Sequence, residues 1–135
     1  MLNELIEPLA SVKLLTGAML AILFLQSGID KVTDFAGNLS WLQGHFAKTP
    51  FRGQVRNMLV TITIAEVLAG ALCAVGAVQL VLSGSTTFAQ YGAQVAATCI
   101  AMLFFGQRIA KDYAGAATLV PYFTLSVGAV MLMRM

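Results

Sequence analysis

The sequence predicts an all-α protein, a four-helix transmembrane bundle with an interfacial helix in its first long loop. Of the 135 residues, 59% are hydrophobic and only 10% are charged, whereas soluble domains carry about 25% charged residues. The surface of so short a chain would be apolar in water. The length suits a single transmembrane domain of about four spans, each of about 20 residues. We therefore expect a lipid bilayer as the solvent.

The first span is predicted at about 12–29. Pro8 is well placed to open this helix, because proline is tolerated in the first helical turn. No charged residue follows Lys13 until the pair Asp30-Lys31, where the helix leaves the apolar layer.

The next apolar stretch, 57–107, contains one charged residue, Glu66, and is too long for a single span. A Ser/Gly/Thr cluster at 83–87 divides it, because such clusters between apolar segments form turns. The second and third spans are therefore predicted at about 57–82 and 88–107.

A polar patch at 107–112 separates the third span from a fourth, predicted at about 113–133. Pro121 falls early in that last span. Membranes tolerate such a proline where neighbouring helices or Ser/Thr side chains satisfy the freed backbone groups.

The long connection at 30–56 contains the pattern of an amphipathic helix. Three large apolar residues recur at i, i+3 and i+7 beside Trp41. These residues are Leu39, Leu42 and Phe46. We expect this helix to lie in the membrane plane with its tryptophan at headgroup depth, and to end at Pro50 and Gly53.

Four spans place both termini and the short turn on one side of the membrane. The long loop and the second polar patch then share the other side. Six basic residues fall on the loop side and two on the terminal side. They are Lys31, Lys48, Arg52, Arg56, Arg108 and Lys111, against Lys13 and Arg134. The positive-inside rule predicts a cytoplasmic loop and external termini.

Glu66 is the most informative single residue. It lies about nine positions into its predicted span, roughly 14 Å from the cytoplasmic end at 1.5 Å per residue. An acidic group costs roughly 2.5 to 3.5 kcal/mol near a span's centre, so Glu66 should face the bundle interior and be neutral or paired. A functional site and a structural helix-to-helix hydrogen bond both satisfy that requirement.

Candidate partners for Glu66 enter from the same membrane side, at the ends of the first and third spans. They form i, i+4 pairs that each share a helix face. The pairs are Gln26 with Asp30, Ser27 with Lys31, and Arg108 with Asp112. These residues predict a buried polar site of Lys31, Glu66, Arg108, Asp112, Gln26 and Asp30. The alternative is a set of solvated helix ends with snorkelling Lys and Arg side chains.

Small residues repeat at i, i+4 and i+8 on two spans, and such spacing lets helix backbones approach closely in lipid. The repeats are Ala65, Ala69 and Cys73, and Ala93, Ala97 and Ala101. The two cysteines, Cys73 and Cys99, have no metal-ligand or redox spacing, so we interpret them as inert packing groups. The scattered basic residues and a net charge of +2 give no reason to expect nucleic acid binding.

The first span ends in the segment Phe24-Leu25-Gln26-Ser27-Gly28-Ile29-Asp30-Lys31, followed by Asp34-Phe35. This segment resembles the Ser-Gly-x-x-Lys pattern with an aromatic residue that closes the first span in the DoxX family of bacterial inner-membrane proteins. Glu66 ahead of Gly70 resembles the family's acidic residue, and 106–115 resembles a variant in some members. The resemblance implies a four-span fold and a place in the bacterial inner membrane.

The DoxX-like resemblance also implies a link to membrane oxidoreductase assemblies, including thiosulfate:quinone oxidoreductase subunits. We therefore expect a non-autonomous subunit of a quinone-linked complex, with other membrane proteins as partners, rather than a stand-alone enzyme. No covalently bound cofactor or metal is expected, but a quinone suits an apolar slot with a polar mouth. The alternatives are a membrane assembly protein without a ligand, and a small transporter or proton path through Glu66.

Overall fold

The computed structural model describes residues 7–135, and within this range all regular structure is helical. The helices are α2 (Pro8–Thr33), α3 (Phe35–His45), α4 (Val55–Ser83), α5 (Thr87–Ile109) and α6 (Tyr113–Met133). All of them except α3 are long and apolar enough to cross a membrane. The predicted fold class is therefore confirmed, and the chain is a small multi-pass membrane protein. Each predicted span lies within one of the four long helices.

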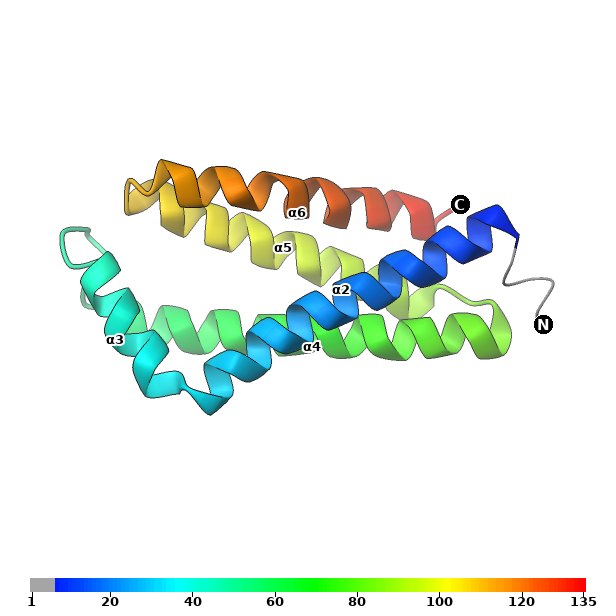
Figure 1. Cartoon of the computed structure of the whole chain (residues 1–135), viewed down its shortest axis with the longest axis horizontal. Helices are drawn as coiled ribbons and strands as arrows, with labels where there is room; N and C mark the ends of the chain where they lie inside the picture. Colours follow the sequence, from blue (N-terminus) through cyan, green and yellow to red (C-terminus); the bar gives the residue numbers. More distant parts are fainter. Residues whose placement is uncertain (1–6) are drawn as a thin grey trace.

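The four long helices form a bundle in which α4 packs against both α2 and α5, and α6 packs on α5. Figure 1 shows α2 crossing α4 obliquely, while α5 and α6 run side by side. The start of α2, the C-terminus and the α4–α5 turn lie at one end of the bundle. The short helix α3 and the α5–α6 turn lie at the opposite end (Figure 1). Six of the eight basic residues of the chain therefore belong to the α3 end.

Local chemistry fixes where the helices begin and end. Pro8 occupies the first turn of α2, and the Glu7 carboxylate accepts hydrogen bonds from the backbone N–H groups of Leu9 and Ala10. These bonds, the one from Ala10 foremost, lower the pKa of the Glu7 carboxyl. At the far end of α4, Gly84 adopts a left-handed conformation with φ of 74°, which glycine adopts without steric cost.

The interfacial helix α3 ends earlier than the sequence predicts. It stops at His45, five positions before Pro50. Phe46 is its C-cap and turns inward to a buried position, with only 5% of its surface exposed. Residues 46–54 then form successive hydrogen-bonded turns, which lead into α4. The helix therefore ends before the proline is reached, at the point where Phe46 packs into the bundle.

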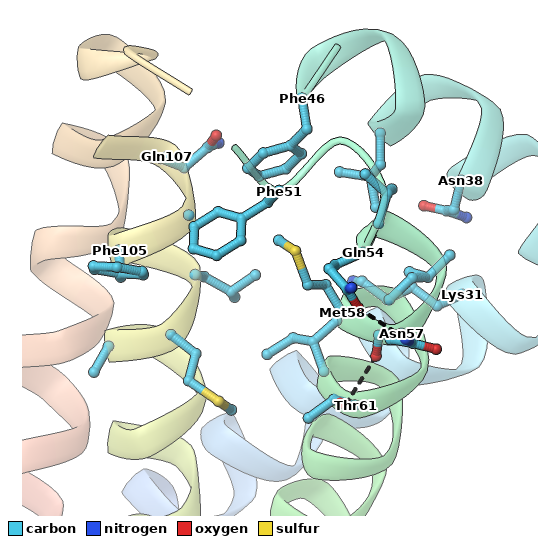
Figure 2. Close-up of a pocket in the computed structure, with 18 of the residues that line it drawn as sticks. Lys31, Asn38, Phe46, Phe51, Gln54, Asn57, Met58, Thr61, Phe105 and Gln107 are labelled. Carbon is cyan, nitrogen blue, oxygen red and sulfur yellow. Dashed lines mark hydrogen bonds between the residues drawn. The ribbon is translucent and has the colours of Figure 1, made fainter. Parts of the chain in front are cut away.

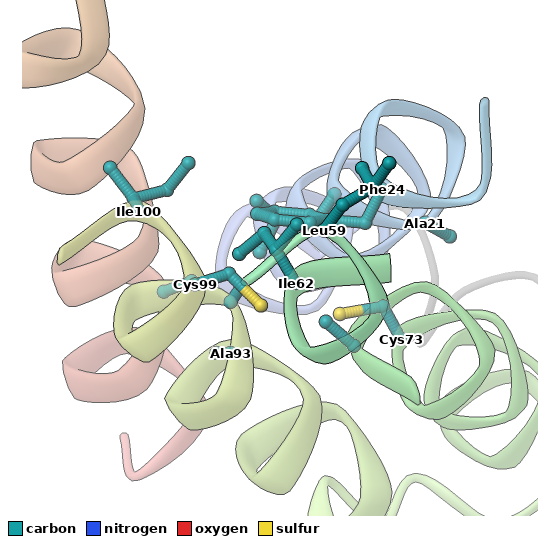
Figure 3. Packing of buried hydrophobic residues seen from close by; sticks show 12 residues of the cluster. Ala21, Phe24, Leu59, Ile62, Cys73, Ala93, Cys99 and Ile100 are labelled. Atoms are coloured by element: carbon teal, nitrogen blue, oxygen red, sulfur yellow. The ribbon is translucent and has the colours of Figure 1, made fainter. Parts of the chain in front are cut away.

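Close backbone contact between helices accompanies the apolar core. A Cβ added at Gly28 would lie 2.7 Å from the side chain of Val67, and one added at Gly70 would lie 2.7 Å from the backbone N of Leu25. Glycines thus let α2 and α4 touch. Figure 3 shows the larger side chains, including Phe24 and Ile62, filling the space that remains in the core.

The predicted small-residue stripe of α4 faces the interior, with Ala69 and Cys73 buried and Ala65 half-buried, but the buried face of α5 differs from its predicted stripe. On α5, Ala93 is buried, Ala97 is half-buried and Ala101 is exposed. The reason is geometric, because steps of four residues advance 400° and an i, i+4, i+8 stripe drifts off a straight contact line. The buried face of α5 instead combines steps of three and four residues. It comprises Ala89, Gly92, Ala93, Ala96, Cys99, Ile100 and Gly106.

Candidate functional site

A buried ion pair joins α2 to the middle of α4. The Lys31 Nζ lies 3.1 Å from Glu66 Oε2, and the Glu66 side chain is only 1% exposed. Glu66 lies about 16 Å beyond the start of α4 at 1.5 Å per residue. The expectation that Glu66 faces the interior and meets a cation from another span is confirmed, with Lys31 as the cation.

The face of α2 that carries Ser27 and Lys31 is the one turned toward α4. Lys31 Nζ donates a 2.8 Å hydrogen bond to Ser27 Oγ in addition to its contact with Glu66. The Lys31 side chain is 18% exposed, so its stem runs from the end of α2 into the bundle. Ser27 therefore holds the ammonium group in place for the carboxylate.

The other predicted pair on α2 does not join this site. Gln26 and Asp30 are both exposed. Each precedes its counterpart in the Ser27 and Lys31 pair by one residue, and one residue rotates a helix by about 100°. Only one of the two faces can point inward, and the structure selects the Ser27 and Lys31 face.

Arg108 and Asp112 also lie apart from Glu66. The exposed Arg108 stacks its guanidinium over the ring of Tyr113, 4.6 Å from the ring centroid. The Asp112 carboxylate caps the start of α6 by accepting a hydrogen bond from the backbone N–H of Gly115. The residues predicted as one polar cluster are therefore divided between the middle of the bundle and the α5–α6 turn.

A second polar contact links α3 to that turn. His45 Nε2 and Gln107 Oε1 are 2.6 Å apart, within hydrogen-bond distance. Asp112 Oδ2 lies 3.8 Å from the same histidine nitrogen. On its other side the imidazole stacks on Trp41, with 4.6 Å between the ring centroids. His45 is thus part of a defined contact rather than a free interfacial side chain.

A cavity of about 830 Å³ lies between these two polar contacts. Residues from α3, α4 and α5 and from the loop before α4 form most of its lining, and α2 and α6 each contribute one residue. Phe46, Phe51 and Phe105 form its aromatic end, and Phe51 and Phe105 meet edge to face with centroids 6.2 Å apart. Figure 2 shows these rings beside Gln107 from α5, with Met58 projecting into the same space from α4.

Polar groups lie along the α4 side of the cavity. Lys31, Gln54 and Asn57 all line it, and Asn57 Nδ2 donates a 3.0 Å hydrogen bond to Gln54 Oε1 (Figure 2). Thr98 and Ala101 of α5 also line the cavity, and both are exposed. The cavity is partly open and carries hydrogen-bonding groups on one wall.

The two cysteines are free and buried. A Cβ added at Gly92 would lie 2.7 Å from Cys73 Sγ, so Cys73 packs against Gly92. Cys99 lies two turns beyond Gly92 on α5, about 10 Å further along the helix axis at 1.5 Å per residue. That separation is too large for a disulfide. The same antiparallel register brings Cys99 level with Glu66.

No family model, no curated protein and no solved structure matches this chain.

Sequence reasoning did not assign His45 a partner, and it had no means of locating the cavity. Gln107 belongs to the polar patch predicted between the third and fourth spans, and its contact is with a residue 62 positions away in the chain. The only local signal was the i, i+4 spacing of Trp41 and His45, which stack on one face of α3.

Proposed function

We propose that this chain is a DoxX-like subunit of a membrane redox assembly in the bacterial inner membrane, and that its cavity takes the head group of a membrane quinone. The observation that carries the proposal is the cavity itself. Its volume of about 830 Å³ falls within the range of about 300–1,000 Å³ typical of small-molecule sites. A quinone needs an apolar slot with a few polar groups, and the lining combines both.

The arrangement of the lining suits a flat ring with a lipid tail. Phe51 and Phe105 offer aromatic surfaces, and aromatic rings favour stacked or edge-to-face neighbours. The exposed lining residues Thr98 and Ala101 leave room for a tail to pass into the bilayer. Lys31 offers a cationic hydrogen-bond donor toward a ring carbonyl. The chain thus supplies binding and orientation, while an associated protein supplies electrons.

Filling the cavity should weaken quinone binding. Ala101 lines the cavity, so Ala101→Phe would place a ring where the ligand lies. Ala71 is exposed on α4 outside the lining, and Ala71→Phe is the matched control. We expect purified protein to bind decylubiquinone, measured by quinone extraction and by titration in detergent. The Ala101→Phe variant should lose at least about tenfold in affinity, a change of about 1.4 kcal/mol, and the control should not.

The opposite result would favour one of the other functions. If the wild-type protein binds no decylubiquinone but retains a stoichiometric membrane partner, an assembly role is favoured over a quinone site. Proton flux into proteoliposomes that stops in Glu66→Gln would instead indicate a proton path.

The proposed orientation places both termini outside the cytoplasm, because six basic residues lie at the α3 end and two at the other. A C-terminal alkaline phosphatase fusion should therefore be active, and a C-terminal green fluorescent protein fusion should be dark. Fusions placed in the loop at 47–53 should give the reverse pattern. A bright C-terminal fluorescent fusion would overturn this orientation.

A further inference from the structure

We propose that α3 is a movable lid over the aromatic end of the cavity, latched to the bundle through His45. This inference rests on the proposed function for the identity of the ligand, and on the contacts of α3 for the lid itself. It assigns a regulatory role to a segment that the sequence predicts only to lie at the membrane interface.

α3 makes few buried contacts with the bundle. None of its 11 residues is buried, and Trp41 is 61% exposed. Phe35, Leu39 and Leu42 are half-buried against the core cluster, so α3 rests on the bundle without entering it. Arg56 of α4 also lies over the Phe35 ring, 5.5 Å from its centroid. Elements with few buried apolar contacts are the ones that open locally at the lowest free-energy cost.

α3 forms part of the wall of the cavity. Asn38, Trp41 and Leu42 line the cavity from α3, and Phe46 lines it at the C-cap. Phe46 lies against Gly106 of α5, where an added Cβ would be 3.4 Å from the Phe46 ring. Figure 2 shows Phe46 and Phe51 together at this end of the cavity. A movement of α3 away from α5 would therefore open the aromatic end toward water.

The latch is a hydrogen bond between α3 and α5. Within residues 7–135, the side-chain hydrogen bond from α3 to α5 is the one between His45 and Gln107. His45 directly precedes Phe46, so the hydrogen bond to α5 and the ring that closes the cavity lie at the same point. Asp112 stands 3.8 Å from the imidazole on the turn between α5 and α6, and Arg108 is engaged with Tyr113.

The two ends of α3 are the hinges of the lid. Asp34 separates α2 from α3, with φ of −126° and ψ of 51°, and its carboxylate caps α3 by accepting from the Gly37 N–H. At the other end, residues 46–54 form turns rather than a helix. Turns at both ends let α3 move as one piece while α2 and α4 stay packed.

The test measures access of water to the cavity in the folded protein. Met58 lines the cavity, and a Met58→Cys variant in a Cys73→Ala, Cys99→Ala background provides one reactive thiol there. A charged, membrane-impermeant maleimide reports how often the lid is open. His45→Phe keeps a ring that can stack on Trp41 but removes the hydrogen bond. Loss of one hydrogen bond should raise the labelling rate by about two- to tenfold.

A second variant and a control separate the latch from general damage. Gln107→Leu removes the same hydrogen bond from α5 and should raise the rate to a similar extent. Ser40→Ala, at an exposed position on α3, should leave it unchanged. Circular dichroism and monodisperse elution identify the folded variants. Unchanged labelling in both His45→Phe and Gln107→Leu would overturn the lid.

Adding decylubiquinone distinguishes the lid from the proposed function. Bound quinone should slow the labelling of Met58→Cys in every variant. Faster labelling in His45→Phe without any protection by quinone would support the lid and contradict the quinone site. Protection by quinone with equal labelling rates in all variants would support the quinone site and contradict the lid.

Discussion

Replacing Lys31 with methionine should destabilise the bundle more than replacing Glu66 with leucine. Glu66 is 1% exposed at mid-helix, and within residues 7–135 its ion pair is the one with Lys31. Lys31 is 18% exposed near the end of α2, so its long side chain can turn toward the interface when Glu66 is absent. Breaking a buried pair costs about 3–5 kcal/mol, and we expect Lys31→Met to fall in that range and Glu66→Leu below it.

Unfolding by sodium dodecyl sulfate in mixed micelles, followed by circular dichroism, measures these differences. Glu66→Gln keeps a hydrogen-bond acceptor for Lys31 and should cost less than either apolar change. The double variant Lys31→Met, Glu66→Leu should be more stable than the sum of the single effects predicts, because no charge is left unpaired. Asp30→Asn, at an exposed position beside the pair, is the matched control and should change stability by less than about 0.5 kcal/mol. Strictly additive effects would contradict the pair.

Hydropathy alone predicted the four long helices, because apolar stretches of spanning length are separated by polar or Gly/Ser/Thr-rich turns. The cost of a carboxylate in lipid likewise predicted that Glu66 would face inward and find a cation. Both predictions depend on one-dimensional information, namely the depth and polarity of each residue along its own helix.

The partner of Glu66 could not be chosen from the sequence, because an i, i+4 pair shows which residues share a face but not which face points inward. The Ser27 and Lys31 face of α2 was as suitable as the Gln26 and Asp30 face until the contact with α4 decided between them. Arg108 was a reasonable cation for Glu66, but Tyr113 offers it a ring close in sequence.

The cavity could not be predicted either, because it depends on how α3 folds back over α4 and α5. Phe46 belongs to the apolar pattern of α3, yet the structure uses it as the residue that ends the helix and closes the cavity. The partner of its neighbour His45 is Gln107, at the C-terminal end of the third span. Such contacts join segments far apart in sequence, and single-sequence periodicity carries no information about them.

Replacing Gly76 with alanine should separate α4 from α5. A Cβ at this position would overlap the backbone N and Cα of Ala89 and lie 2.8 Å from the Ala89 Cβ. Backbone atoms cannot move aside as a flexible side chain can, so the helices must part. We expect a loss of about 1–3 kcal/mol, the usual cost of overpacking, measured by the same micelle unfolding experiment. Gly92→Ala should behave alike, because its Cβ would lie 2.8 Å from the backbone N of Cys73.

Two further variants show whether the backbone contact is responsible for that loss. Gly128 of α6 has open space where a Cβ would be added, so Gly128→Ala should leave stability unchanged or raise it by less than about 1 kcal/mol. Adding Ala89→Gly to Gly76→Ala removes only the Cβ of the neighbour and leaves the overlap with its backbone, so it should recover little stability. Full recovery in that double variant would mean that side chains, not backbones, set the distance between α4 and α5. A Gly76→Ala protein as stable as the wild type would contradict the close approach itself.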